Sequence, residues 1–171
     1  MARKALRSTL LLSALVLLLV VARIGTAQHH PMTSEGVGDT RQPLPLLAMM
    51  AAHQKQNMRD HLAAVQAIVA ALARDDMDGV AKAVSRIGHS EAMGRMCEHM
   101  GAAAPGFTPM ALHFHRTADT IAESARRGDR AGVLSALDRT LQTCVGCHAA
   151  YRQEIVDEET WNRLTTPASR H

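Results

Sequence analysis

Residues 129–155 read DRAGVLSALDRTLQTCVGCHAAYRQEI, and this stretch decides the fold that we expect. Apolar side chains and the residues of a Cys-x-x-Cys-His motif recur along it at every third or fourth position: Leu134, Leu137, Leu141, Cys144, His148, Tyr151 and Ile155. That spacing matches the turn of an α-helix. Asp129 is a favourable N-cap, and Gly128 before it suits the end of a preceding helix. The stretch therefore predicts one long helix with the motif deep inside it.

The motif itself is Cys144, Cys147 and His148. Cys-x-x-Cys-His is the attachment signature of c-type haem. Residues three and four apart share one face of a helix, so all three side chains point to the same side. The thiols can then form thioethers with the two vinyl groups of one porphyrin edge, while the imidazole reaches the iron as an axial ligand. We predict one haem c per chain, with His148 as the proximal iron ligand.

Three other uses of these residues are less favourable. A thioredoxin-like redox site lies at the start of a helix after a strand, and no strand pattern surrounds this motif. A zinc site needs a second pair of ligands, for which only Cys97 and His99 are at hand and nothing positions them. A disulfide between Cys144 and Cys147 is sterically poor within a helix.

Three further helices are expected before residue 129. The first covers about Leu46 to Arg74, on a stripe made of Leu47, Met50, Gln54, Met58, His61, Val65, Ile68 and Leu72. The second is marked by Val80, Val84 and Ile87, and the Met-rich segment 88–101 adds a helical turn or two. The third begins with Thr108 as N-cap and Pro109 at the first helical position. Four amphipathic helices with short links predict an all-α protein, an antiparallel four-helix bundle over residues 46–157.

The chain outside this domain is expected to be leader and tails. A basic start is followed by the apolar run Leu10–Ala22 and by Gly25-Thr26-Ala27, which predicts a signal peptide over residues 1–27 and a periplasmic protein. The run is short of the roughly 20 residues of a stable span, although an uncleaved anchor is the alternative. Residues 28–45 are polar and broken by Gly and Pro, which predicts a flexible tail, and residues 158–171 a loosely held one.

The charge of the chain depends on this leader. Four of the 19 Lys and Arg residues lie within it and none of the 16 Asp and Glu residues do, so the remainder carries 15 − 16 = −1. A chain with that balance gives no reason to expect nucleic-acid binding.

Residues 144–152, CVGCHAAYR, carry a family resemblance, because a haem motif in the last helix is unusual among small c-type cytochromes. Over about residues 46–156 the chain resembles the cytochrome c-prime family and its low-spin, methionine-ligated relatives. The resemblance implies that Cys144 and Cys147 form the thioethers and that Tyr151 belongs to the cofactor site. It implies that Arg152 lies beside the exposed haem edge or a propionate. It also implies that the first helix covers the distal face of the haem and that the protein forms a homodimer.

The distal iron ligand and the function remain open at this stage. Met58 is the favoured sixth ligand, because it lies mid-stripe in a polar part of the first helix; His61, Met50 or no protein ligand are the alternatives. A Met-ligated haem predicts a one-electron carrier that serves redox partner proteins and is not an enzyme. An open distal position predicts a five-coordinate protein that binds NO or CO.

Two groups outside the site receive structural roles. Met93, Met96 and Met100 could form a soft-metal cluster with Cys97 and His99, but core packing is the expected use. His115 is expected to be solvated and to pair with Asp119 one helical turn later.

Overall fold

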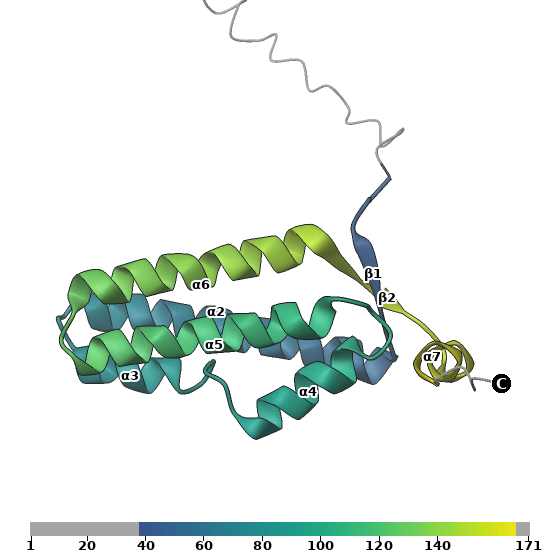
Figure 1. Cartoon of the computed structure of the whole chain (residues 1–171), viewed down its shortest axis with the longest axis horizontal. Coiled ribbons are helices and arrows are strands. Elements are labelled where there is room, and N and C mark those ends of the chain that lie inside the picture. Colours follow the sequence, from purple (N-terminus) through teal and green to yellow (C-terminus); the bar gives the residue numbers. More distant parts are fainter. Residues whose placement is uncertain (1–37, 167–171) are drawn as a thin grey trace, which may run out of the picture. The chain divides into compact units, whose positions relative to one another are not determined.

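The computed structural model describes residues 38–166. This part of the chain is mostly helical, so the all-α prediction is confirmed at that level (Figure 1). Its helices are α2 (Ala48–Leu72), α3 (Met77–Val84), α4 (Glu91–Gly101), α5 (Phe107–Arg126), α6 (Arg130–Ala150) and α7 (Glu158–Thr165), and its strands are β1 (Gln42–Leu46) and β2 (Tyr151–Ile155). Among these helices none combines the length and the hydropathy needed to cross a membrane. The expected signal peptide, residues 1–27, lies outside the described residues.

Side-chain caps begin four of the described helices, α3, α4, α6 and α7. Asp129 accepts a hydrogen bond from the Gly132 backbone N–H at 2.8 Å, which confirms it as the N-cap of α6. Asp76 caps α3 in the same way, and Ser90 caps α4. Each such cap contributes about 1 kcal/mol to the stability of its helix. The segment 88–101 therefore forms an independent helix of 11 residues, longer than the turn or two expected.

The start of α5 differs from the prediction. Gly106, with φ 86°, precedes the helix, and Thr108 lies inside it instead of capping it. Glycine suits the left-handed backbone at this position because it has no Cβ. The Thr108 hydroxyl instead donates to the Cys97 carbonyl at 3.3 Å, and this bond ties α5 to α4.

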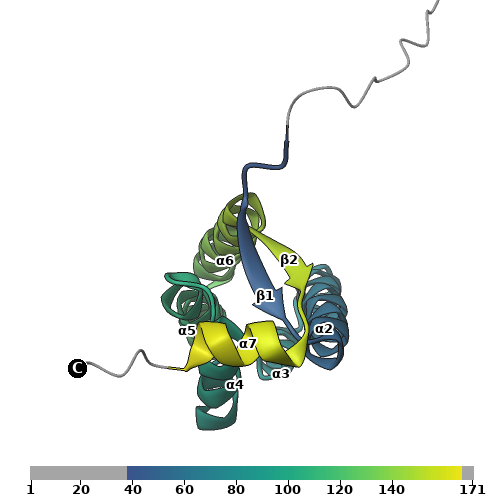
Figure 2. The same cartoon turned by 90° about the vertical axis from the view of Figure 1, so that its right-hand side faces the viewer.

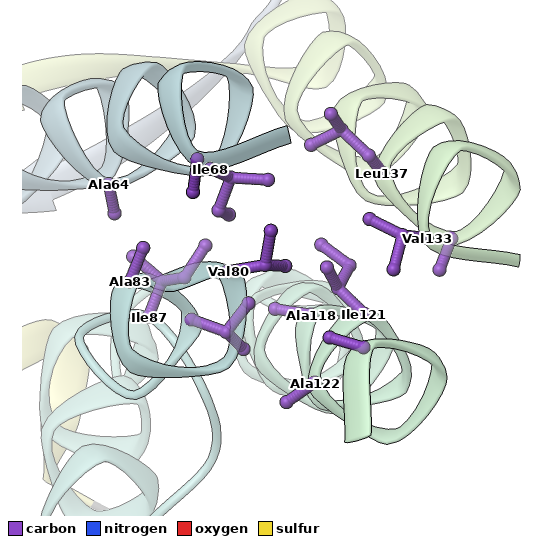
Figure 3. Packing of buried hydrophobic residues seen from close by; sticks show 14 of the residues in the cluster. Ala64, Ile68, Val80, Ala83, Ile87, Ala118, Ile121, Ala122, Val133 and Leu137 are labelled. Carbon is purple, nitrogen blue, oxygen red and sulfur yellow. The ribbon is translucent and has the colours of Figure 1, made fainter. Parts of the chain in front are cut away.

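The first core cluster joins α2, α3, α5 and α6 (Figure 3). Its largest fully buried members are Ile68, Val80, Val84, Ile87, Ile121 and Val133. Alanines such as Ala64 and Ala118 lie between them and let the helix axes approach closely. Helix α6 packs along α5, α5 on α3 and α3 on α2, whereas α2 and α6 make few or no close contacts with each other.

The second core cluster lies at the end of the helices where β1, α4 and α7 meet. Its buried members are Leu44, Leu46, Ala51, Met100, Ala104, Phe107 and Trp161. Two of these residues correct the predicted tails where the structure describes them, at residues 38–45 and 158–166. Leu44 is buried within β1, although residues 28–45 were expected to be flexible, and Trp161 is 8% exposed within α7, although residues 158–171 were expected to be loose.

Helix α6 also ends earlier than predicted. The sequence pattern extended it to Ile155, but Tyr151 is extended, with φ −124° and ψ 146°, and starts β2. Strand β2 pairs in parallel with β1, from Gln42 beside Tyr151 to Leu46 beside Ile155. Figure 2 shows the two strands between the end of α6 and the start of α2. The partner of β2 is more than 100 residues away in the sequence, so local periodicity could not reveal the pairing.

Candidate functional site

The Cys-x-x-Cys-His motif occupies the C-terminal part of α6. Cys144 packs against the first core cluster and Cys147 against the second, so both thiols lie on the inner side of the helix where the clusters meet. Both are half-buried, and both are free thiols. His148, the next residue, is exposed at the edge of the same side. The expected common face is therefore present for the cysteines, with the imidazole at its solvent margin.

The electrostatics of the two thiols argue against a thiol–disulfide redox site. Burial raises the pKa of Cys144, and burial together with the neighbouring Cys144 raises the pKa of Cys147. Reactive cysteines in thioredoxin-like sites have lowered pKa values and lie at helix N-termini. Here the motif lies near a helix C-terminus, where the helix dipole disfavours a thiolate. The two thiols are therefore neutral at physiological pH.

A zinc site is also poorly supported. Within residues 38–166 no three His, Cys, Asp or Glu side chains come together as a metal-binding group. The only residues that the sequence offered as a second ligand pair, Cys97 and His99, lie on α4, and the His99 ring instead contacts the Trp161 ring at 6.0 Å.

The buried face of α6 is rotated from the predicted one. Leu134 and Leu141, expected in the interior, are 51% and 40% exposed, whereas Val133 and Thr140 are fully buried. The reason is that α5 packs on the side of α6 that carries Val133 and Thr140. The adjacent side, which carries Leu134 and Leu141, is left uncovered. Val145 shares that uncovered side, since it follows Leu141 by one helical turn.

Helix α2 carries a similar uncovered apolar side. Met58, Leu62 and Val69 are exposed, and they follow one another at intervals of four and seven residues, which places them on one face. The helices that carry these faces, α2 and α6, make few or no close contacts with each other (Figure 2). Exposed apolar faces of this kind mark a surface that another group covers.

One hydrogen bond shows which residues of α2 and α6 lie at the same position along the helix axes, that is, at the same level. The Arg130 guanidinium at the start of α6 donates to the Leu72 carbonyl at the end of α2, at 2.7 Å. The helices run in opposite directions (Figure 1). A residue a given number of positions after Arg130 in α6 is therefore level with the residue the same number of positions before Leu72 in α2. Eighteen residues along each helix, about 27 Å, bring His148 level with Gln54. Fourteen residues along each helix, about 21 Å, bring Cys144 level with Met58.

The three candidate distal residues differ in their distance along the helix axis from the level of His148. Met58 lies about one helical turn, roughly 6 Å, from the level of His148, and Met50 lies about one turn to the other side. His61 is seven residues from Gln54, about 10 Å along the axis. Met58 is 37% exposed, whereas Met50 is half-buried against the second core cluster beside Cys147.

His61 is held in the interior by aromatic rings. It stacks on Phe114 with ring centroids 4.8 Å apart and meets the edge of His115 at 5.5 Å. Burial, and to a smaller extent His115, lower the pKa of His61 from 6.5 to about 4, so it is neutral at pH 7. His115 was expected in solvent beside Asp119, but it is buried, and its ring nitrogen Nδ1 lies 2.7 Å from the Ile87 carbonyl.

Tyr151 and Arg152 lie in β2 and not on the predicted helix. The Tyr151 hydroxyl donates to the Pro105 carbonyl at 2.9 Å, and its ring meets the edge of Phe107 at 5.5 Å. Arg152 pairs with Glu154 at 3.1 Å. Both side chains lie just beyond the motif, but each already has a partner within the protein.

One cation beside the motif was missed by sequence reasoning. The Arg41 guanidinium donates to the His148 carbonyl at 3.3 Å. Arg41 fell within the predicted flexible tail and so was given no role. The alternation of Leu44 and Leu46 with prolines was the available signal, because period-two apolar residues favour a short strand.

A basic hollow lies on the other side of the motif. It is lined from α5 by His113 and Arg116 and from α6 by Arg139 and Thr143, together with Thr117, Thr120 and Gln142. Thr143 directly precedes Cys144, so the hollow adjoins the motif. Comparisons of the chain with models of protein families, with curated proteins and with solved structures find no match.

Proposed function

We propose that this protein is an exported c-type cytochrome of the c-prime kind, in which α2, α3, α5 and α6 are the four bundle helices. It carries one haem c on Cys144 and Cys147, with His148 as the proximal iron ligand. The observation that carries the proposal is the state of the motif. Two free, neutral, half-buried thiols three residues apart lie on the inner side of α6, with an imidazole beside them.

The donor set fits this cofactor. Addition of a thiol across a vinyl group needs no oxidant, because sulfur bonds to one carbon of the double bond and the hydrogen goes to the other. The uncovered apolar faces of α2 and α6 offer the porphyrin a binding surface. Covering them removes apolar area from water at about 25 cal/mol per Å².

Each part of the chain then has a specific task. The cysteines tether, His148 binds iron, and the apolar residues of α2 and α6 exclude water. Arg41 and Arg152 lie close enough to the motif to hold the carboxylate groups of the ring edge. The haem supplies a one-electron couple between ferrous and ferric iron.

Met58 is the distal ligand in this proposal. It lies on the uncovered face of α2, level with Cys144 and about one turn from the level of His148. With Met58 and His148 both holding the haem, its iron would keep the same protein ligands in both oxidation states, and little rearrangement would accompany electron transfer. That coordination favours an electron carrier over an enzyme.

The second candidate function is binding of NO or CO at a five-coordinate haem. It is favoured by the exposure of Met58, which belongs to neither core cluster. The neutral His61 would then line an open distal side without a positive charge.

The surroundings of the motif suit a soluble redox partner. The hollow lined by Arg116, Arg139 and His113 gives a basic docking surface next to Cys144 for an acidic partner protein. Export to the periplasm rests on the signal peptide expected over residues 1–27, and the homodimer rests on the family resemblance.

Covalent haem attachment tests the proposal directly. The full chain is produced in a bacterial periplasm together with c-type haem attachment machinery, and haem is stained on a denaturing gel. Wild type should retain haem through denaturation, whereas the Cys144→Ala, Cys147→Ala double variant should lose it completely. Cys97→Ala is the matched control and should retain full staining, because Cys97 lies on α4 away from the motif. Equal staining of the double variant and wild type would refute the proposal.

A further inference from the structure

A sulfur–nitrogen pair joins α2 to α4. His53 Nε2 lies 3.1 Å from the sulfur of Met96, and the Asn57 side-chain nitrogen lies 3.6 Å from the same sulfur. His53 is exposed and Met96 is half-buried. His53 and Met58 are five residues apart, about 140° around the helix, so this pair lies on a different face from the proposed distal ligand.

Further thioethers lie close to this pair. Met50 is one helical turn before His53, and Met100 is one turn after Met96. Met50, Met96 and Met100 all belong to or pack against the second core cluster. The Met96 sulfur therefore lies beside an imidazole that solvent can reach, with two further methionines within a helical turn along the same helices.

The distance between the two ligand atoms suits a shared metal ion. Metal–nitrogen bonds of about 2.0 Å and metal–sulfur bonds of about 2.3 Å, at a tetrahedral angle, separate nitrogen and sulfur by about 3.5 Å. His53 and Met96 lie at hydrogen-bond distance, 3.1 Å, so the two atoms would move apart by about 0.4 Å to share an ion. The two side chains could bind one ion with little movement.

The chemistry of the donors selects the ion. Thioethers are soft ligands that favour Cu(I), whereas harder ions prefer carboxylates and water. The neighbouring Cys97 follows Met96 by one residue, about 100° around α4, so its buried side chain lies on a different side of the helix from the donor pair. His99 is not in the set either, since its ring contacts Trp161.

We propose that His53 and Met96 form a Cu(I)-binding site between α2 and α4. The proposal is independent of haem attachment and uses side chains that the cytochrome function leaves without a role. Ion entry needs no opening of the fold, because the imidazole faces solvent.

The test is a competition for Cu(I) against a chromogenic Cu(I) chelator, under anaerobic reducing conditions. The background variant is Cys97→Ala in the haem-loaded chain, where Cys144 and Cys147 are consumed as thioethers. If no haem attaches, the chain with all three cysteines replaced by Ala is used, so failure of the cytochrome proposal leaves this test intact. One equivalent of Cu(I) should be withdrawn from the chelator.

Matched substitutions assign the ligands. His53→Ala and Met96→Leu should each lower the Cu(I) affinity at least tenfold, with unchanged far-ultraviolet circular dichroism. His99→Ala and Met49→Leu are the controls and should bind as the background does, because His99 contacts Trp161 and Met49 is 84% exposed. The proposal is overturned if the background chain withdraws no copper, or if Met96→Leu binds as tightly as Met49→Leu.

Discussion

Two histidines in the interior illustrate how single residues shape this fold. His115 is 3% exposed, and a proton on its Nδ1 is donated to the Ile87 carbonyl just after α3. A buried carbonyl without a hydrogen-bond donor would lower the stability by about 1–3 kcal/mol. The hydrogen bond from His115 avoids this loss, which explains a polar side chain in the core. His61 has no such bond and is held by its stack on Phe114.

Acid should destabilise the protein through this pair. Burial lowers the pKa of both histidines, and that of His61 falls from 6.5 to about 4. The unfolded chain therefore binds more protons than the folded one between these values. The neutral His61 ring therefore contributes fully to the free energy of unfolding above pH 6.5, and this contribution is lost as pH falls towards 4. We expect it to amount to about 1–3 kcal/mol for His61, allowing for its partial exposure.

The measurement is the free energy of unfolding by urea at several pH values between 7.5 and 4.5. His61→Phe keeps an aromatic ring against Phe114 but cannot take up a proton, so it should flatten part of the pH dependence. His113→Phe, at an exposed position of α5, is the control and should follow wild type. An identical slope for His61→Phe and wild type would show that His61 does not titrate in this window.

At the scale of elements, the relative level of α2 and α6 decides which residue can oppose His148. The hydrogen bond between Arg130 and Leu72 sets that level, and it leaves Met58 and Met50 each about one turn away. The uncovered face of α2 contains Met58 and not Met50, because Met50 packs into the second core cluster.

Replacing Met58 should therefore change the iron centre of the haem-loaded protein. Met58→Ala should convert a low-spin ferric spectrum into a high-spin one, lower the reduction potential and let CO bind the ferrous protein faster. Met49→Ala, at the most exposed methionine of α2, should leave the spectrum unchanged. Optical spectra in both oxidation states give the readout. If wild type is already high-spin and Met58→Ala matches it, NO or CO binding replaces electron transfer as the function.

At the scale of the whole molecule, stability is expected to depend on the cofactor. The first core cluster is built largely from Ala and Val, and the neighbouring faces of α2 and α6 leave Leu62, Val69 and Val145 in water. A group that binds only the folded state stabilises it, and a covalently attached one cannot be diluted away.

Chain produced without haem attachment should accordingly melt at least about 10 °C below the haem-loaded form, with a broad transition. Thermal unfolding followed by circular dichroism, on matched samples with and without haem, makes the comparison. The Cys97→Ala variant controls for oxidation of the remaining thiol. A cooperative melt of the haem-free chain at the temperature of the loaded form would show that the helices need no cofactor.

The sequence by itself determined the helices and the motif that they carry. Periodicity over residues 46–74 predicted α2 to within two residues at each end, and Asp129 and Gly128 marked the link between α5 and α6. These features are local: a helix forms its hydrogen bonds within four residues, and its caps lie next to it. The spacing of Cys144, Cys147 and His148 is local in the same sense.

Only the tertiary structure decided what closes the end of the molecule and which faces are covered. Strand β2 exists because residues 42–46 pair with it from more than 100 residues away, and this pairing ends α6 at Ala150. The same long-range packing buries Trp161 and rotates the buried face of α6 from Leu134 to Val133. A side chain's burial depends on the neighbour that packs against it, and periodicity carries no information about which neighbour that is.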